Sequence, residues 1–216
     1  MWRERILGAL LALLVVAGAP CAFADNAGSS GTTFADATST PSVTVERLHA
    51  ALIEVMKDAK ALGYEGRRQR LDPVIRAAYD LPLMTEIVMG PAWKSLSQND
   101  RSAVVAAFSD WTIANYASRF DGWDGEAFVT GDQADGGRGT IVVHTKLTSQ
   151  KDEPVALDYR LRKGDDGWRI IDIYADSAIS ELATRRSEFA SVLSQGGLPV
   201  LLDRLRQRTQ ALAQHS

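Results

Sequence analysis

Phenol and carboxyl groups are the side chains of this sequence whose types and positions could support catalysis. Tyr79, Tyr159 and Asp172 could transfer protons beside a carbonyl group if the fold placed them together in an apolar cavity. The structural alternative is that Asp172 caps or pairs within a sheet, while the tyrosines fill the core with their hydroxyl groups at its edge. We favour the structural alternative, and therefore predict no catalytic residue and no enzyme.

Histidines are the other candidates for chemistry, and their positions do not suggest a metal site. None of His49, His144 and His215 stands at metal-ligand spacing from another, and the single cysteine, Cys21, excludes a multi-cysteine site. Spacing alone leaves a Ser–His–Asp triad open, although lone histidines are more often structural or surface residues. The sequence has no motif of α/β-hydrolases, zinc proteases, P-loop proteins or dinucleotide-binding proteins. We predict no metal and no cofactor.

The composition is that of an ordinary globular protein and excludes two classes of function. The 216 residues are 45% hydrophobic and 24% charged, and the formal net charge is −3. A nucleic-acid-binding protein should carry an excess of basic residues, so no nucleic-acid partner is predicted. The one long apolar stretch, residues 6–19, is shorter than the ~20 residues that a membrane-spanning helix needs.

The N-terminal residues have the pattern of a secretory signal peptide. Two arginines precede the apolar stretch, and Ala22-Phe23-Ala24 is typical of a cleavage site that follows its last residue. Residues 1–24 are therefore predicted to be removed on export across the inner membrane, into the periplasm. A lipoprotein is the alternative, but Pro20 stands before Cys21, where a small residue is expected.

The exported chain is expected to contain one domain. Residues 25–40 are rich in Gly, Ser, Thr and Ala, which predicts a flexible tether. The domain should follow over residues 41–212, with a short tail over 213–216. Apolar residues recur at spacings of three and four from Pro41 onward, which predicts a helix that Gly63 ends.

Capping signals predict three more helices in the first half of the chain. Asp72-Pro73 resembles an N-cap followed by proline at the first helical position. Asp80-Leu81-Pro82 should start a short helix that Gly90-Pro91 stops. Ser97 and Asp100 resemble a capping box at the start of a long helix.

Strands are expected after Gly122, at residues 126–130, 139–148, 155–162 and 168–174, with turns at 135–137 and 164–167. The third strand alternates apolar and polar residues, which predicts one buried face and one wet face. In the fourth, Trp168 and Ile170 should share one face, and Ile171 and Ile173 the other.

Helical patterning returns after Ser177, and Gly196-Gly197 should separate a last helix. Helices, then a strand meander, then helices indicate an α+β domain, with helices packed on one face of an antiparallel sheet.

The order of these motifs resembles a known family. The segments that carry the resemblance are Leu71-Asp72-Pro73-Val74-Ile75, Tyr79-Asp80-Leu81-Pro82-Leu83-Met84, Val88-Met89-Gly90-Pro91-Ala92-Trp93 and Gly167-Trp168-Arg169-Ile170-Ile171-Asp172-Ile173. With Ser97, Asp100 and Tyr116 in the long helix, they resemble the periplasmic MlaC, or toluene-tolerance, family of ABC-transporter auxiliary proteins, over roughly residues 43–212. The resemblance implies an NTF2-like/MlaC-like fold, in which a helical layer on a strongly curved antiparallel sheet encloses an internal hydrophobic pocket for lipid.

Within that family, residues 178–189 are similar to the branch associated with hopanoid biosynthesis, called HpnM. Ala178-Ile179-Ser180 stands where the commoner phospholipid-binding members carry Gly-Val-Ser. The resemblance implies a shuttle for hopanoids, which are triterpenoid lipids, between the inner and outer membranes. Its expected partners are an inner-membrane RND-type exporter and, transiently, the membranes. The alternatives are a phospholipid shuttle served by an ABC-type complex, a cavity-bearing enzyme acting on a polycyclic lipid, and a lipid-free adaptor.

Apolar facing and the architecture of the family together predict which residues line the pocket. They are Leu48, Leu52, Val55, Ile75, Tyr79, Met84, Ile87, Val88, Phe108, Trp111, Tyr116, Val143, Leu157, Tyr159, Ile171 and Ile173. Periodicity does not separate a filled core from a lined pocket, so part of this set is expected to be plain core.

Overall fold

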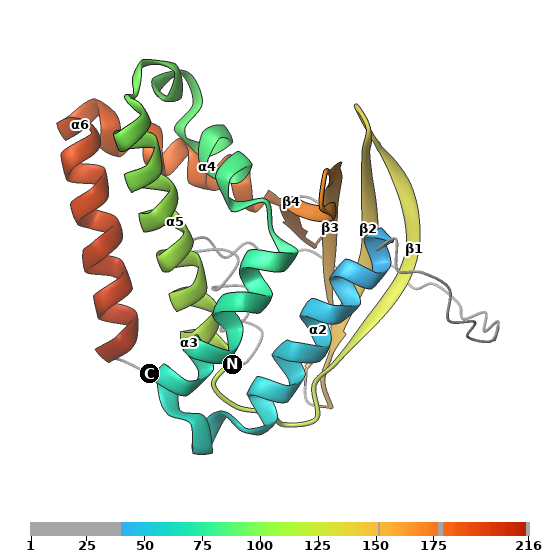
Figure 1. Cartoon of the computed structure of the whole chain (residues 1–216). Coiled ribbons are helices and arrows are strands. Elements are labelled where there is room, and N and C mark those ends of the chain that lie inside the picture. The colour runs from blue at the N-terminus through green and yellow to red at the C-terminus, as the bar shows by residue number, and fades with distance from the viewer. Residues whose placement is uncertain (1–39, 151, 177–178, 215–216) are drawn as a thin grey trace.

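The computed structural model describes residues 40–150, 152–176 and 179–214, which form a layer of helices beside one antiparallel sheet (Figure 1). The predicted α+β fold class is therefore confirmed. The predicted signal peptide and all but the last residue of the predicted tether lie outside the described residues. Within the described ranges, no helix combines the length and the hydrophobicity that crossing a membrane requires.

The first predicted helix is two helices. Helix α2 (Pro41–Lys57) begins at Thr40, whose side-chain oxygen accepts a hydrogen bond from a backbone amide of the first turn at 3.3 Å. Asp58 separates α2 from α3 (Ala59–Ala78), so the prediction of one helix reaching Gly63 is wrong. Gly63 instead interrupts α3 with φ 60° and ψ −177°, a backbone conformation that is almost restricted to glycine.

Asp72-Pro73 does not start a helix, contrary to the sequence prediction, because Pro73 lies inside α3. The neighbouring Leu71 and Ile75 are fully buried, and this tertiary packing outweighs the backbone hydrogen bond that proline lacks. Asp72 instead pairs with Arg76 one turn later, with 2.8 Å between Oδ1 and Nε.

The next capping signals are confirmed. The elements that follow are α4 (Leu81–Met89), the 3₁₀ helix η1 (Gly90–Ser95) and α5 (Gln98–Arg119). Asp80 caps α4, since its Oδ1 accepts a hydrogen bond from the amide of Leu83 at 3.1 Å. Ser97 caps α5 in the same way, with 3.1 Å between its Oγ and the amide of Asp100.

The sheet is antiparallel throughout, with its strands in chain order. The strands are β1 (Ala127–Gly137), β2 (Thr140–Thr148), β3 (Val155–Gly164), β4 (Gly167–Ala175) and the two-residue β5 (Ile179–Ser180). The turn predicted at residues 135–137 lies at Arg138 and Gly139 instead, because β1 continues to Gly137 and pairs there with Thr140. Both turn residues have positive φ, 53° at Arg138 and 73° at Gly139, as a two-residue hairpin turn of type I′ requires.

A β-bulge changes the predicted faces of β4. Arg160 pairs with Asp172, but the next residue of β3 pairs with Ile170, so Ile171 is the extra residue of the bulge. Ile170 and Ile173 therefore both belong to the core cluster, and the prediction that Ile171 and Ile173 share a face is wrong.

Helix α6 (Glu181–Gln214) follows β5. Gly197 interrupts it, with φ 65° and ψ −165°, at the separation that the sequence predicts. Asp172 of β4 stabilises the start of α6. Its Oδ1 accepts a hydrogen bond from the amide of Leu182 at 3.1 Å, and its Oδ2 accepts one from the hydroxyl of Ser180 at 2.7 Å.

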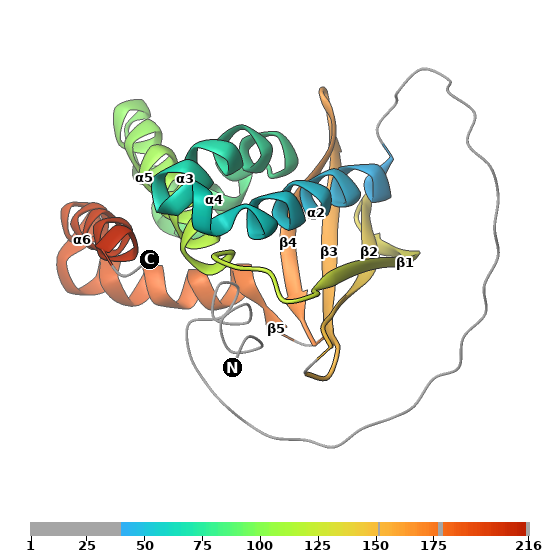
Figure 2. The same ribbon diagram turned by 90° about the horizontal axis from the view of Figure 1, so that it is seen from below.

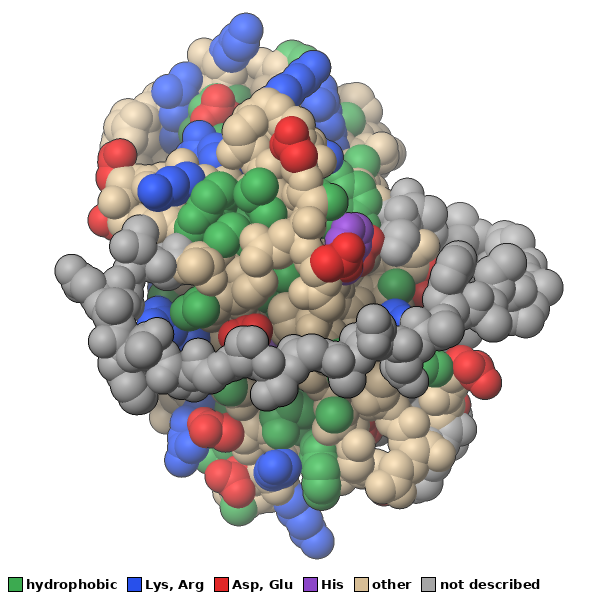
Figure 3. Space-filling view, turned by 90° about the vertical axis from the view of Figure 1, so that its right-hand side faces the viewer, with side chains coloured by type: hydrophobic (Ala, Val, Ile, Leu, Met, Phe, Trp, Pro, Cys, Tyr) green, Lys and Arg blue, Asp and Glu red, His purple; other side chains and the backbone are tan. Residues whose placement is uncertain are grey.

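The core lies between the helices and the inner face of the curved sheet. Helix α2 lies along this face, while α3, α4 and α6 contact the sheet at β4 (Figures 1 and 2). Helix α5 and the part of α6 that follows Gly197 lie side by side, farther from the strands. Figure 3 views the molecule from the side of β1, where hydrophobic side chains gather between charged ones.

Candidate functional site

The predicted pocket residues lie together in the interior, between the helical layer and the sheet. Fourteen of the sixteen belong to one continuous cluster of buried apolar side chains: Leu48, Leu52, Val55, Ile75, Tyr79, Met84, Val88, Phe108, Trp111, Tyr116, Val143, Leu157, Tyr159 and Ile173. Ile87 is half-buried and packs against this cluster, whereas Ile171 is buried outside it, at the bulge. In this conformation most of these side chains pack against one another.

A small cavity lies among them, between α4, α5, β4 and the start of α6, and we call it the inner cavity. Its lining residues are Tyr79, Met84, Phe108, Trp111, Thr112, Asn115, Tyr116, Ile173, Glu181, Leu182 and Arg185. Its volume of about 40 Å³ is room for no more than a few water molecules. A hydrocarbon chain could enter only if the surrounding elements moved apart.

Two tyrosine hydroxyls form a polar part of the wall of the inner cavity. The hydroxyls of Tyr79 and Tyr116 are hydrogen-bonded to each other, and both side chains are buried. Burial raises the pKa of both phenols above its ordinary value, since the charged form would lose its hydration. Both phenols are therefore protonated at neutral pH, so they form hydrogen bonds and do not act as bases.

Glu181 and Arg185 add a buried ion pair to the same wall. Arg185 Nε lies 2.7 Å from Glu181 Oε1, and its Nη1 lies 3.0 Å from Glu188 Oε2. The guanidinium also stacks over Trp111, 4.5 Å from the ring centroid. Burial raises the pKa of Glu181 to about 7, although Arg185 opposes the shift.

A second buried polar pair links α2 to the sheet. The hydroxyl of Tyr159 lies 3.0 Å from His49 Nε2, and the His49 ring stacks on Phe128 with 3.9 Å between centroids. Burial lowers the pKa of His49 to about 3, so its imidazole is neutral at physiological pH. His49 also lines a groove of about 580 Å³ between α2 and β1, beside the half-exposed Trp123.

The three residues considered for acid–base chemistry direct their polar atoms to different partners. Tyr79 bonds to Tyr116, Tyr159 bonds to His49, and Asp172 caps α6. This arrangement matches the structural alternative, in which these groups hold the fold.

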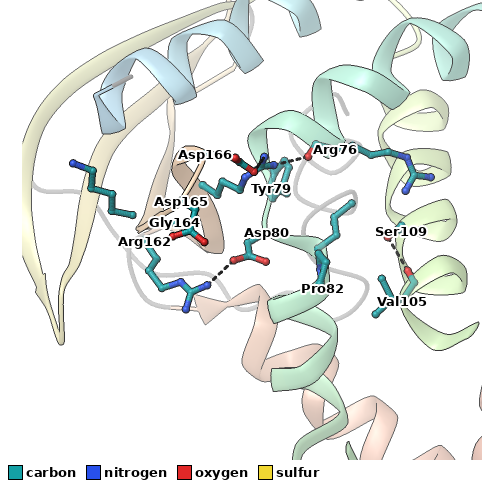
Figure 4. A pocket seen from close by; sticks show the side chains of 13 residues that line it. Arg76, Tyr79, Asp80, Pro82, Val105, Ser109, Arg162, Gly164, Asp165 and Asp166 are labelled. Atoms are coloured by element: carbon teal, nitrogen blue, oxygen red, sulfur yellow. Dashed lines mark hydrogen bonds and ion pairs between the residues drawn. The ribbon is translucent and has the colours of Figure 1, made fainter. Parts of the chain in front are cut away.

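A larger polar cavity adjoins Tyr79 and opens between α3, α4, α5 and the β3–β4 turn (Figure 4). Its volume is about 680 Å³. Basic and acidic side chains face one another around it, and Arg162 Nη2 lies 2.9 Å from Asp80 Oδ2. Tyr79 lines both this cavity and the inner cavity, so its ring separates a charged surface cavity from the apolar interior.

Sequence reasoning missed the polar part of the inner cavity. Asn115, Glu181 and Arg185 line it, yet none was among the predicted site residues. The available signal was the spacing of Glu181 and Arg185, one helical turn apart, which favours an ion pair. That spacing is common on exposed helices, so it does not reveal burial.

A solved structure with a similar fold is the phospholipid-binding protein from Ralstonia solanacearum, determined in complex with a phospholipid. The TM-score is 0.69 and the sequence identity is 26%, over 83% of this chain and 99% of the other. The family model described as "MlaC protein" matches residues 46–207. Because this match spans most of the sequence, the chain belongs to the MlaC family.

Proposed function

We propose that this protein is a periplasmic lipid shuttle, which carries one membrane lipid between the inner and outer membranes with its hydrocarbon held between the helices and the sheet. The observation that carries the proposal is the continuous apolar interior of the fold. The bound phospholipid in the similar Ralstonia protein supports it.

A membrane lipid needs a carrier because moving its hydrocarbon through water is costly. Each CH₂ group exposed to water costs about 0.8 kcal/mol, so a membrane lipid leaves a bilayer only slowly without help. A protein interior that replaces water around the hydrocarbon removes most of this cost. No catalytic group is needed, because the lipid leaves the protein chemically unchanged.

Opening of the interior is part of the proposal. The helices and the sheet are joined mainly by apolar side-chain contacts, which have no fixed direction and can be exchanged for contacts with a hydrocarbon chain. The glycine breaks at Gly63 and Gly197 divide α3 and α6 into shorter segments, and these segments could shift separately as a lipid enters.

The cargo that the sequence favours is a hopanoid, with an RND-type exporter as the membrane partner. The motif Ala178-Ile179-Ser180 is the basis for this choice. A rigid fused-ring lipid also loses little conformational entropy on binding. A phospholipid handled by an ABC-type complex is the second candidate, and the ligand of the Ralstonia protein favours it.

Enzymatic action on a polycyclic lipid is a less favoured function. It would require Asp172 or a buried tyrosine to reach the substrate, whereas Asp172 accepts hydrogen bonds from Ser180 and Leu182. An enzyme would show turnover of an added polycyclic lipid that depends on these side chains.

The cargo is tested by mass spectrometry of an organic extract of the protein purified without detergent. A triterpenoid at about one molecule per chain is the expected result. A phospholipid at the same ratio would transfer the proposal to the second candidate. An extract without any lipid, before and after incubation with vesicles of the same lipids, would contradict the shuttle.

A further inference from the structure

The inner cavity combines an apolar wall with a small set of polar atoms that are incompletely paired. Glu181 Oε1 accepts a hydrogen bond from Arg185, but Glu181 Oε2 is buried and has no hydrogen-bond partner among the residues that the structure describes. A buried carboxyl oxygen without a partner is costly, so such an atom needs an explanation.

The two tyrosines of the same wall have one more hydroxyl proton than their mutual hydrogen bond uses. Each phenol carries one proton, and only one of these protons can lie between the oxygens of Tyr79 and Tyr116. The other proton must point elsewhere. The residues that line the inner cavity therefore include a phenol with a proton to donate and a carboxyl group with an oxygen that can accept.

The charges at the inner cavity argue against an anionic ligand. Arg185 is paired with both Glu181 and Glu188, and Arg208 lies 3.4 Å from Glu188 Oε2. Two basic and two acidic side chains thus balance, and a phosphate group would meet the carboxyl group of Glu181. An acyl chain has no polar atom at its end to satisfy either the donor or the acceptor.

A hydroxyl group is small and can both donate and accept a hydrogen bond. It can accept a hydrogen bond from a tyrosine and donate one to Glu181, and a cavity of about 40 Å³ has room for it. A buried water molecule could satisfy the same atoms, and a ligand hydroxyl would take its place.

Resting on the proposed carrier function, we infer that Glu181, Tyr79 and Tyr116 form a recognition site for an alcohol, so that the lipid enters with a hydroxyl-bearing end innermost. The apolar side chains of α4, α5 and β4 then surround the hydrocarbon behind that hydroxyl. This site selects neutral lipids that carry a hydroxyl over lipids whose buried part is hydrocarbon alone.

Two matched probes test the site: hexadecan-1-ol and hexadecyl methyl ether, which share the same chain but differ in the hydroxyl proton. Their equilibrium binding to the delipidated protein is compared. The wild type should bind the alcohol about tenfold or more tightly than the ether, because a buried site built for a hydroxyl rejects the analogue that cannot donate.

A variant that removes the acceptor should remove this preference. Glu181→Met deletes it while keeping most of the side-chain volume, and should bind both probes with similar affinity. Glu188→Gln is the matched control, since Glu188 also pairs with Arg185 but does not line the inner cavity. It should keep the preference, as should Tyr116→Phe, because Glu181 and the hydroxyl of Tyr79 remain. If Glu181→Met does not fold, Glu181→Gln decides the question, because its carbonyl oxygen can accept from Arg185 and its amide nitrogen then offers only donors in place of the free oxygen.

The outcomes separate the inference from the proposed function. Equal binding of both probes by the wild type would overturn the alcohol site and leave the carrier intact. A preference that persists in Glu181→Met, or in Glu181→Gln where that variant is used, would also overturn it, because the hydroxyl would then be held elsewhere. If neither probe binds, the alcohol site is overturned, and the lipid content of the purified protein decides the carrier function separately.

Discussion

At the scale of single residues, burial favours the neutral form of two titratable side chains on opposite sides of the core. It raises the pKa of Glu181 to about 7 and lowers that of His49 to about 3. The shifts should be visible in how stability depends on pH. The two shifts act in opposite directions, because one group is an acid and the other a base.

Glu181 should make the folded state less stable as pH rises. Its pKa is higher in the folded than in the unfolded chain, so its stabilising contribution is complete below pH 4.5 and is lost as pH rises to about 7. Glu181→Gln mimics the neutral acid and removes this change. Urea unfolding at pH 4.5 and 7.5 should show wild type losing roughly 1–3 kcal/mol relative to the variant. A difference that does not vary with pH would mean that Arg185 holds the pKa of Glu181 at its ordinary value, against burial and against the charges of Glu188 and Asp172.

His49 should have the reverse effect. Its pKa is depressed in the folded chain, so its contribution is present above pH 6.5 and is lost as pH falls towards about 3. His49→Gln keeps a polar partner for Tyr159 but does not titrate. Between pH 6.5 and 4.5 the wild type should lose roughly 2–3 kcal/mol relative to this variant. Parallel stability curves for the two proteins would show that His49 is protonated in the folded state.

Part of the interior could be predicted from the sequence. Apolar facing and the architecture of the family placed Tyr79, Trp111 and Tyr116 among the predicted pocket residues, and these three line the inner cavity. Their contact with lipid stays a prediction. Glu181 and Arg185 were missed, because a charged pair one turn apart indicates an exposed helix unless the tertiary structure is known.

At the scale of elements, two glycines interrupt long helices in the same way. Gly63 in α3 and Gly197 in α6 both combine φ near 60° with an extended ψ. Side chains larger than hydrogen are strained in this region by of order 1–3 kcal/mol. The course of the helical layer around the core therefore depends on these two positions.

Alanine at either glycine should destabilise the fold. Gly63→Ala and Gly197→Ala should each lower the free energy of unfolding by about 1–3 kcal/mol, measured by urea unfolding. Gly122→Ala is the matched control, because its φ is not positive and an added Cβ would meet open space. If both helix variants were as stable as the control, the breaks would be soft bends that the chain adopts without strain.

Two of the three capping signals predicted helix starts correctly, and the third did not. Asp80 and Ser97 cap their helices as expected, since an N-cap depends only on residues within one turn. Pro73 was misread because the burial of its neighbours, a tertiary effect, keeps it inside α3. The bulge at Ile171 was likewise invisible, because it depends on the partner strand.

At the scale of the whole molecule, the interior must exchange protein contacts for lipid contacts. Ile87→Trp places a large ring beside the half-buried edge of the core, where lipid would compete with it. Lipid recovered with the purified variant should fall severalfold while its circular dichroism and melting temperature stay near those of wild type. Ala106→Trp, at an exposed position of α5, should not change recovery. Equal recovery from both variants would remove Ile87 from the lipid site.

The carrier function is tested most directly by locating the hydrocarbon chain of a bound lipid. A phospholipid and a triterpenoid, each with a photoactivatable diazirine in its hydrocarbon part, can be loaded, irradiated and mapped by peptide mass spectrometry. If the hydrocarbon is held between the helices and the sheet, adducts should form on interior residues such as Leu52, Val88 and Tyr116 for at least one of the two lipids. Adducts confined to outward-facing residues such as Val129, with none in the interior for either lipid, would contradict it.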